Sequence, residues 1–333
     1  MAKIAVMGAG SWGTTFAKIL ADAGNEVTIW ARRDDLVEEI NDDHRNGDYL
    51  PGIKLPKSLR ANSDAAAVLA DAEQVYLAVP SQSLRSNLQT WGSSIPKDAI
   101  LVSLMKGVEK DTGLRMSEVI AQATEFPTGQ IVVVSGPNLA LEIANEEPAA
   151  SVAASSSKAS ALAVAKAASN SYFTTFTNGD VIGTEFGGIL KNLIAVAIGI
   201  VNGVGYGQNT KASIMTRGLA EISRFAVAYG AKPSTMVGLA GLGDLIATAE
   251  SPLSRNHRAG EMLGKGYTKK EVLKRMSQTA EGLSSVAPVL NLAAEKGVSM
   301  PIVEQVNLVI EGKMNPQDIA PHLTHESEQP QGE

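Results

Sequence analysis

The first 178 residues alternate between short apolar runs and segments with the spacing of amphipathic helices. The runs lack the apolar–polar alternation of half-exposed strands, which is typical of parallel strands covered on both faces. They are Lys3–Met7, Glu26–Trp30, Gln74–Val79, Ile100–Leu104 and Ile131–Val134. The predicted helices between them are Trp12–Ala23, Asp34–Asn41, Asp64–Leu69, Gln82–Trp91 and Leu114–Ala123. This order predicts an α/β fold with a doubly wound sheet and right-handed crossovers.

The sheet domain is expected to end near residue 178, where the pattern changes. Ala149–Ala154 and Phe173–Thr177 resemble two further strands around the helix Lys158–Ala168. Beyond residue 178 the blocks are helical: Thr184–Val201, Ala212–Tyr229, Ser234–Leu239, Arg255–Lys265, Lys269–Met276, Ala280–Lys296 and Pro301–Ile310. We therefore expect a sheet domain over 1–178, an all-α domain over 179–326 and a disordered tail over 327–333.

Composition excludes several classes of function. The 333 residues contain no Cys, which rules out disulfides, thiolate metal sites and thioester catalysis. The formal net charge of -6 argues against nucleic acid or an anionic membrane surface as the main partner. The apolar stretch Gly187–Val204 contains Lys191, which favours a buried core helix over a membrane span. With no targeting segment evident, a cytoplasmic protein is expected.

A glycine fingerprint follows the first predicted strand directly. Gly8-Ala9-Gly10-Ser11-Trp12-Gly13 opens the first helix, which is the context that a G-x-G-x-x-G motif requires. In such motifs the first glycine allows the tight turn, the second lets the backbone approach a pyrophosphate, and the third lets the helix pack on the strand. The alternative is a tight turn without a ligand. The pattern favours a Rossmann-like domain that binds a dinucleotide.

The end of the second strand bears on which dinucleotide binds. An NAD-selective site usually has Asp or Glu there, whereas this chain has Arg32 and Arg33, followed by Asp34. Arginine can pair with a 2′-phosphate, so we expect NADP(H) to be used and NAD(H) to be accepted as well. The alternative is that both arginines are solvated and Asp34 reaches the ribose. No metal cofactor is expected.

A nicotinamide enzyme also needs a group that exchanges a proton with its substrate. No Tyr has Lys four residues later, which excludes short-chain dehydrogenases, and the lack of Cys excludes zinc-dependent alcohol dehydrogenases. His44, His257, His322 and His325 all lie in predicted loop or terminal contexts, where surface positions are expected.

Lys191 is the remaining candidate. It interrupts the most apolar helix of the chain, and Lys is rarely buried without a partner. Asp244, in a Gly-rich segment predicted as a turn, is a natural partner. The alternatives are a lysine that extends to the helix edge and an aspartate that only caps a helix.

Ser254-Arg255-Asn256 opens another predicted helix and can hold a small phosphate. A capped surface helix with solvated arginines would give the same pattern. Together with the dinucleotide fold and Lys191, the segment favours a phosphorylated carbonyl substrate.

These motifs, taken in order, resemble the bacterial glycerol-3-phosphate dehydrogenase [NAD(P)+] family over residues 3 to about 324. The matching segments are GAGSWGT (8–14), AVPSQ (78–82), KGVE (106–109), SGPNLALE (135–142), KNLIAVAIGI (191–200), TRGLAEISR (216–224), GLAGLGDL (238–245), SRNHRAG (254–260) and EG (281–282). The resemblance implies an oxidoreductase that reversibly reduces dihydroxyacetone phosphate to sn-glycerol 3-phosphate for phospholipid biosynthesis. It also implies a homodimer.

The resemblance implies roles for individual residues. Lys191 would be the general acid/base, supported by Asp244. The cofactor would contact Gly8, Gly10, Ser11, Trp12, Gly13, Arg32, Arg33, Lys106, Ala140, Arg255, Thr279 and Glu281. The substrate would contact Lys106, Gly136, Asn138, Lys191, Asp244, Ser254, Arg255 and Asn256. Many relatives have Thr or Ser at Asn138 and Val at Thr279, so Thr279 is expected to contribute only its backbone.

Two other functions share parts of this pattern. A ketopantoate-type reductase on the same two-domain plan would hold a carboxylate where Arg255 and Asn256 are expected to hold a phosphate. A non-catalytic cofactor sensor would bind NADP(H) without needing Lys191 or Asp244.

Overall fold

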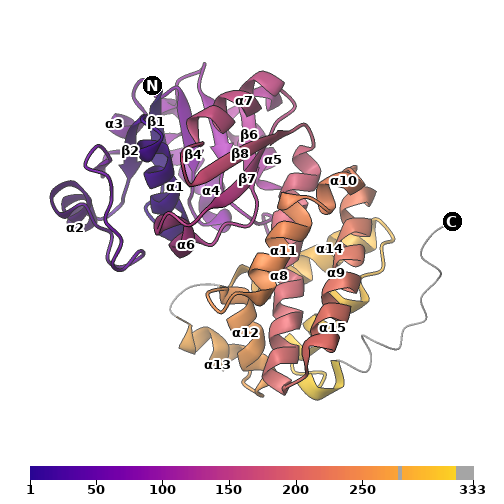
Figure 1. Ribbon diagram of the computed structural model, residues 1–333. Helices are drawn as coiled ribbons and strands as arrows, with labels where there is room; N and C mark the ends of the chain where they lie inside the picture. The colour runs from indigo at the N-terminus through magenta and orange to yellow at the C-terminus, as the bar shows by residue number, and fades with distance from the viewer. Residues whose placement is uncertain (277–279, 320–333) are drawn as a thin grey trace. The chain divides into compact units, whose positions relative to one another are not determined.

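The computed structural model describes residues 1–276 and 280–319, and these form two compact units that divide between Glu185 and Phe186 (Figure 1). The division falls inside one helix, whereas the change in sequence pattern occurs near residue 178. The contact predicted for Thr279 and the tail predicted for 327–333 lie outside the described residues. Each unit is described by itself.

The first unit is built on one eight-stranded sheet with the order β3-β2-β1-β4-β5-β6-β7-β8. Neighbouring strands are parallel except β6 and β7, which are antiparallel. The strands are β1 (Lys3–Met7), β2 (Glu26–Trp30), β3 (Arg60–Asn62), β4 (Gln74–Leu77), β5 (Ile100–Ser103), β6 (Ile131–Ser135), β7 (Ala149–Ala154) and β8 (Phe173–Asn178).

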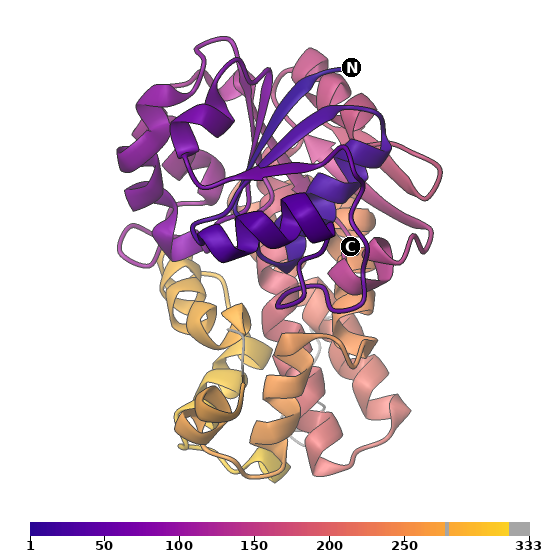
Figure 2. The same ribbon diagram turned by 90° about the vertical axis from the view of Figure 1, so that its left-hand side faces the viewer.

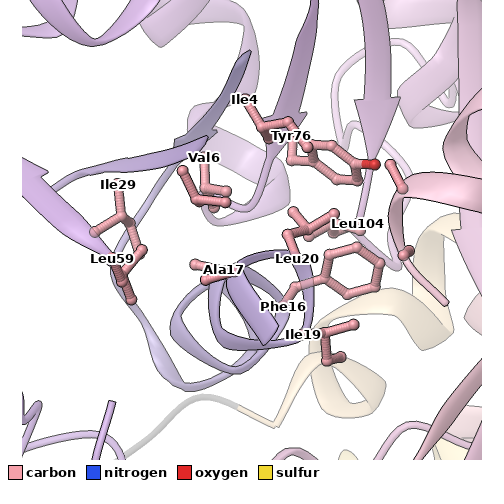
Figure 3. Close-up of a cluster of buried hydrophobic side chains, with 14 of the residues drawn as sticks. Ile4, Val6, Phe16, Ala17, Ile19, Leu20, Ile29, Leu59, Tyr76 and Leu104 are labelled. Atoms are coloured by element: carbon pink, nitrogen blue, oxygen red, sulfur yellow. The ribbon is translucent and has the colours of Figure 1, made fainter. Parts of the chain in front are cut away.

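Helices cover both faces of this sheet (Figures 1 and 2). Side chains alternate along each strand, so Ile4 and Val6 enter one hydrophobic core, while Ala5 and Met7 enter the other. Figure 3 shows Phe16 and neighbouring residues of α1 packed against the first of these cores. The helices of this unit are α1 (Ser11–Asp22), α2 (Asp34–Glu38), α3 (Ala65–Leu69), α4 (Leu84–Trp91), α5 (Met116–Thr124), α6 (Ala140–Ala144) and α7 (Lys158–Ala167).

Two short elements of the first unit are absent from the sequence prediction. The strand β3 has only three residues, two of them polar, so it carries no strand pattern. The helix α6 has five residues and follows Gly136-Pro137, where a loop is expected. The α/β sheet domain itself was predicted and is confirmed.

The second unit is helical and is built around α8 (Val181–Val204). The other helices are α9 (Gln208–Ala228), α10 (Pro233–Met236), α11 (Asp244–Glu250), α12 (Arg255–Gly264), α13 (Lys269–Arg275), α14 (Glu281–Glu295) and α15 (Pro301–Ile310). Among the described residues, α8 is the helix long and apolar enough to cross a membrane, but 83% of its most apolar window is buried. It is therefore placed as a core helix, as its sequence predicts.

Glycines bring α8 and α12 into backbone contact. A Cβ built on Gly199 would lie 2.2 Å from the carbonyl oxygen of His257, and one on Gly203 would lie 2.2 Å from that of Glu261. From the other helix, a Cβ on Gly260 would lie 2.2 Å from the carbonyl oxygen of Val196. No larger residue fits at these positions without separating the two helices.

The helices α9 and α15 are joined by a buried carboxylate. Glu221 of α9 is 1% exposed and accepts hydrogen bonds from the backbone N–H groups of Ile302 (3.0 Å) and Val303 (3.1 Å). These are among the N–H groups that a helix start leaves without a partner, and the helix dipole favours a negative charge there. Burial nevertheless raises the pKa of Glu221 to about 7, although the two N–H groups act in the opposite direction.

We expect Gly199→Ala to destabilise the second unit by roughly 1–3 kcal/mol, the usual cost of overpacking a core. The added methyl group meets a backbone oxygen that cannot rotate away. The urea midpoint of the helical far-ultraviolet signal measures the effect. Gly179→Ala is the matched control, because a Cβ there meets nothing within 4 Å. Equal midpoints for the two variants would contradict the role given to the close crossing.

Glu221 also predicts how stability depends on pH. Because its folded pKa of about 7 lies above the ordinary value of 4.5, its contribution is fully present below pH 4.5 and is lost as the pH rises through 7. Relative to Glu221→Gln, which does not titrate, the wild type should therefore lose about 3 kcal/mol of unfolding free energy across this range. Denaturant unfolding of both proteins at a series of pH values tests this. A pH-independent difference would show that Glu221 stays ionised.

Candidate active site

The glycines of the fingerprint have the geometry that close approach requires. Gly8 has φ +129°, and a Cβ there would lie 2.7 Å from the carbonyl oxygen of Ala78. A Cβ on Gly13 would lie 2.0 Å from the carbonyl oxygen of Gly8, so the helix packs directly on the turn. A Cβ on Gly10 would meet nothing within 4 Å. Space therefore opens beside Gly10, at the point where α1 begins.

The start of α1 is suited to bind an anion. Its N-cap residue is Gly10, which has no side chain to bond the first N–H groups, and the first turn holds no acidic residue. The N-terminus of a 12-residue helix thus presents N–H groups and the positive end of its dipole. Ser11, the first residue of the helix, donates its hydroxyl to the carbonyl oxygen of Tyr49 at 3.0 Å.

Several buried polar atoms near the carboxyl ends of the strands have no hydrogen-bond partner among the described residues. They include Trp12 Nε1, Ser103 Oγ, Ser135 Oγ and both amide atoms of Asn138. Ser103 and Ser135 end β5 and β6, and Trp12 lies in the first turn of α1. In open α/β sheets this is the edge where ligands bind. Together with the glycine geometry, these atoms fit a bound dinucleotide.

The two arginines after β2 differ in their contacts. Arg33 is ion-paired with Asp48 (2.5 Å) and lies 3.6 Å from Asp35, and it is largely exposed. Arg32 is exposed and has no charged or hydrogen-bonded partner within the described part of the chain. Asp34 begins α2. Arg32 is thus the guanidinium that is free to meet a phosphate.

Two contacts organise the loop after β6. The Lys106 amine donates to the carbonyl oxygen of Gly136 at 3.0 Å. Gly136 has φ +152°, and a Cβ there would lie 3.0 Å from the Cα of Ser151. Where this loop ends and α6 begins, Thr15 of α1 donates to the carbonyl oxygen of Ala140 at 3.2 Å. The Lys106 side chain, from the segment after β5, thus contacts the segment between β6 and α6 that contains the predicted residues Gly136, Asn138 and Ala140.

In the second unit, Lys191 and Asp244 form a buried ion pair. Their side chains are 8% and 1% exposed, and Lys191 Nζ lies 2.6 Å from Asp244 Oδ1. The same Nζ donates to Thr248 Oγ1 at 2.5 Å. A buried charge is costly unless it is paired and hydrogen-bonded, and this amine is both. The pairing predicted from sequence is present in the structure, with Thr248 as an additional partner.

The surroundings of Asp244 differ from the sequence prediction. Asp244 lies in the first turn of the helix α11, not in a Gly-rich turn, and the preceding Leu239–Gly243 forms a π-helical turn. The glycines there serve packing, because a Cβ on Gly241 would lie 2.1 Å from the carbonyl oxygen of Met236. Thr248 was missed in the sequence. Its signal was the spacing of four residues from Asp244, which places both on one helix face.

The predicted phosphate segment forms the start of α12. Ser254 is the N-cap, and its hydroxyl accepts from the backbone N–H of His257 at 3.2 Å. Arg255 follows as the first helical residue and is exposed, with no ion pair or hydrogen bond among the described residues. The first turn of this ten-residue helix holds no acidic residue. A guanidinium and free N–H groups thus occupy the same helix end.

His257 contradicts the prediction that the histidines lie at the surface. It is 8% exposed, and its ring contacts the preceding helix through Nδ1. Its position after Arg255-Asn256, one turn into an amphipathic helix, turns it inward. His322 and His325 lie outside the described residues.

A chain of amides links three helices. The backbone N–H of Gly282 donates to Asn256 Oδ1 (2.9 Å), and Asn256 Nδ2 donates to Asn192 Oδ1 (2.8 Å). Asn192 Nδ2 in turn donates to the carbonyl oxygen of Gly188 at 3.4 Å. We call these four residues the amide relay. It joins α14, which begins at Glu281, to α12 and to the helix that carries Lys191. Asn192 is the second residue that the sequence reasoning missed.

Comparison with known proteins identifies the family. Residues 3–161 match the family model for the N-terminus of NAD-dependent glycerol-3-phosphate dehydrogenase, and residues 180–321 match the model for its C-terminus. The chain is 63% identical to a glycerol-3-phosphate dehydrogenase [NAD(P)+] of Leifsonia xyli over 98% of this chain and 89% of that protein. It is 55% identical to one of Streptomyces griseus, covering 93% of each chain.

A solved structure agrees with these matches. The crystal structure of a glycerol-3-phosphate dehydrogenase from Coxiella burnetii superposes with a TM-score of 0.90 at 34% identity, covering 97% of this chain and 98% of that one. The fold and the sequence thus lead to the same conclusion as the glycine fingerprint and the buried Lys191. This chain belongs to the NAD-dependent glycerol-3-phosphate dehydrogenase family and is an NAD(P)-dependent oxidoreductase.

Proposed function

We propose that this enzyme reversibly reduces dihydroxyacetone phosphate to sn-glycerol 3-phosphate, with Lys191 as the general acid and Asp244 as its partner. The observation that carries the proposal is the buried ion pair between Lys191, in the most apolar stretch of α8, and Asp244, at the start of α11. A buried ion pair contributes little to stability compared with a hydrophobic pair of similar volume. Its presence here is therefore better explained by chemistry than by folding.

The reduction places one demand on Lys191. When bound, the nicotinamide cofactor supplies the hydride that reaches the ketone carbon. The carbonyl oxygen then gains electron density, and the Lys191 ammonium donates a proton to it. In the oxidation direction, the neutral amine takes the proton of the substrate hydroxyl. Asp244 and Thr248 fix the position of Nζ, so that the proton moves without a search through side-chain rotamers.

Arg255 is proposed to bind the substrate phosphate. Its guanidinium is exposed and unpaired among the described residues, and the start of α12 adds N–H groups. Arginine offers two parallel donors that match the oxygens of a phosphate. Ser254 and Asn256 are proposed as further substrate contacts. A carboxylate substrate would need less of this positive charge, which favours the phosphorylated ketone over a ketopantoate-type substrate.

The first unit supplies the remaining proposed contacts. The glycine turn with Ser11 and Trp12 would hold the cofactor pyrophosphate. The free guanidinium of Arg32 supports binding of a 2′-phosphate, so NADP(H) is proposed as the preferred cofactor. Arg33, Ala140 and Glu281 are proposed cofactor contacts. Lys106, Gly136 and Asn138 are proposed to contact the substrate, which is supported by the unpartnered amide of Asn138.

The cellular setting is also proposed. The product, sn-glycerol 3-phosphate, would supply glycerophospholipid synthesis from the cytoplasm. We propose a homodimer, supported by large apolar side chains exposed on the second unit. These are Val237 (63%), Leu273 (51%) and Ile246 (45%).

Lys191→Ala should lower the rate of dihydroxyacetone phosphate reduction by roughly 10²–10⁴, as expected for loss of a general acid. NADPH binding should be retained, because the proposed pyrophosphate contacts lie in the other unit. NADPH absorbance measures turnover, and NADPH fluorescence titration measures binding. Lys191→Met is a second variant that keeps the apolar stem. Near-normal turnover in a folded Lys191→Met enzyme would exclude the proposed role.

Arg255→Ala should raise the apparent KM for dihydroxyacetone phosphate by roughly 10- to 100-fold, as expected for loss of a charge-assisted hydrogen bond. Turnover of unphosphorylated dihydroxyacetone, which carries no phosphate for Arg255 to bind, should change little. Steady-state kinetics on both ketones give the comparison. Arg255→Lys is the control, because it keeps the charge but not the two parallel donors. If Arg255→Ala affects the two ketones equally, Arg255 does not bind the phosphate.

A further inference from the structure

The joint between α11 and α12 brings together two groups of proposed site residues. The helix α11 carries Asp244 and Thr248, and α12 begins with Arg255 and Asn256. Only residues 251–254 connect the two helices. The proton-transfer group and the phosphate-binding group are therefore correctly placed only if this joint is rigid.

One side chain bridges the joint. His257 Nδ1 lies 2.6 Å from the carbonyl oxygen of Ala249, and the ring is 8% exposed. A carbonyl oxygen can only accept, so Nδ1 must carry the hydrogen. The carbonyl of Ala249 is available because α11 ends at Glu250, and the N–H of Leu253 bonds instead to Ser251 Oγ at 3.2 Å. The imidazole thus caps the end of α11.

Each end of the hydrogen bond between His257 and Ala249 is next to a residue of the proposed site. Ala249 is the residue after Thr248, which holds the Lys191 amine. His257 is the residue after Asn256, the centre of the amide relay. A shift at either end of the bond is passed through one peptide unit to a proposed site residue.

We propose that His257 is a positioning residue that keeps the start of α12 in register with the Lys191–Asp244–Thr248 group. This inference rests on the proposed function, because it assumes that the substrate is held by both groups. His257 itself does not touch substrate in this proposal. It acts through the backbones of Ala249 and of α12.

The other ring nitrogen allows a sharp test. Nε2 has no hydrogen-bond partner among the described residues, and His257 lines a cavity of about 400 Å³. The charged and polar residues around this cavity are Asn202, Lys211, Glu250, Arg258 and Glu261. The bridge therefore depends on Nδ1 alone. Asparagine can place an amide nitrogen near the Nδ1 position, within reach of the carbonyl oxygen of Ala249. Glutamine places its amide nitrogen near the Nε2 position, away from that oxygen.

The experiment compares His257→Asn, His257→Gln and the wild type in steady-state kinetics. His257→Gln should raise the KM for dihydroxyacetone phosphate and lower kcat/KM by roughly tenfold, the size expected for one neutral hydrogen bond. His257→Asn should remain within about threefold of the wild type. The Kd for NADPH should stay the same in all three proteins. Thermal unfolding of each protein separates a kinetic effect from loss of folded enzyme.

The proposal is overturned if His257→Gln and His257→Asn behave alike, or if the loss of turnover only follows the loss of folded protein. A second measurement needs no variant. Nitrogen-15 NMR of the wild type should show a histidine whose Nδ1 carries a hydrogen protected from exchange, and its absence would also overturn the proposal. Full activity of His257→Gln beside an inactive Lys191→Ala would refute only this inference. An active Lys191→Ala would instead refute the proposed function.

Discussion

The contact between α8 and α12 fixes the separation of the site residues proposed in the second unit. Four glycines, two on each helix, let the backbones approach closely, with Gly199 facing Gly260 and Gly203 facing Gly264. One helix carries Lys191 and Asn192 upstream of its glycines, and the other begins with Arg255-Asn256 upstream of its own. The 2.8 Å bond between Asn256 and Asn192 is possible only at this separation. Packing between the two helices thus sets the length of a hydrogen bond beside the proposed Lys191 site.

The first unit applies the same principle to its ligand edge. Gly8 and Gly13 remove the side chains that would separate α1 from the strands, so the helix end comes directly above the sheet. What remains at that edge is polar and without partners among the described residues: an indole N–H, two hydroxyls and one amide. Leaving such groups buried and unsatisfied is costly, and a bound ligand that pairs with them recovers that cost. Ligand binding at this edge would therefore gain hydrogen bonds to groups that the protein itself leaves unpaired.

Sequence reasoning predicted the parts that depend on pattern and missed those that depend on packing. Lys191 was evident because it is the charged residue within the apolar stretch Gly187–Val204, and its pairing with Asp244 followed from the need for a counter-charge. Thr248 and Asn192 were missed because each is an ordinary polar residue until the helices are assembled. The helix α11 was hidden by glycines that resemble a turn but serve close packing. His257 was misplaced because a cap on a neighbouring helix has no local sequence signal.

The amide relay has a direction, and this has a consequence for chemical ageing. Every donor points the same way, from Gly282 through Asn256 and Asn192 to the carbonyl oxygen of Gly188. Deamidation of Asn256 would replace its Nδ2 donor with a carboxylate oxygen facing Asn192 Oδ1, and two acceptors cannot hydrogen-bond to each other. Replacing one nitrogen atom with oxygen would then turn the attraction between Asn256 and Asn192, which joins α12 to α8, into a repulsion. Hydrolysis of this one buried amide would therefore break the Asn256–Asn192 contact while leaving the size and shape of the side chain almost unchanged.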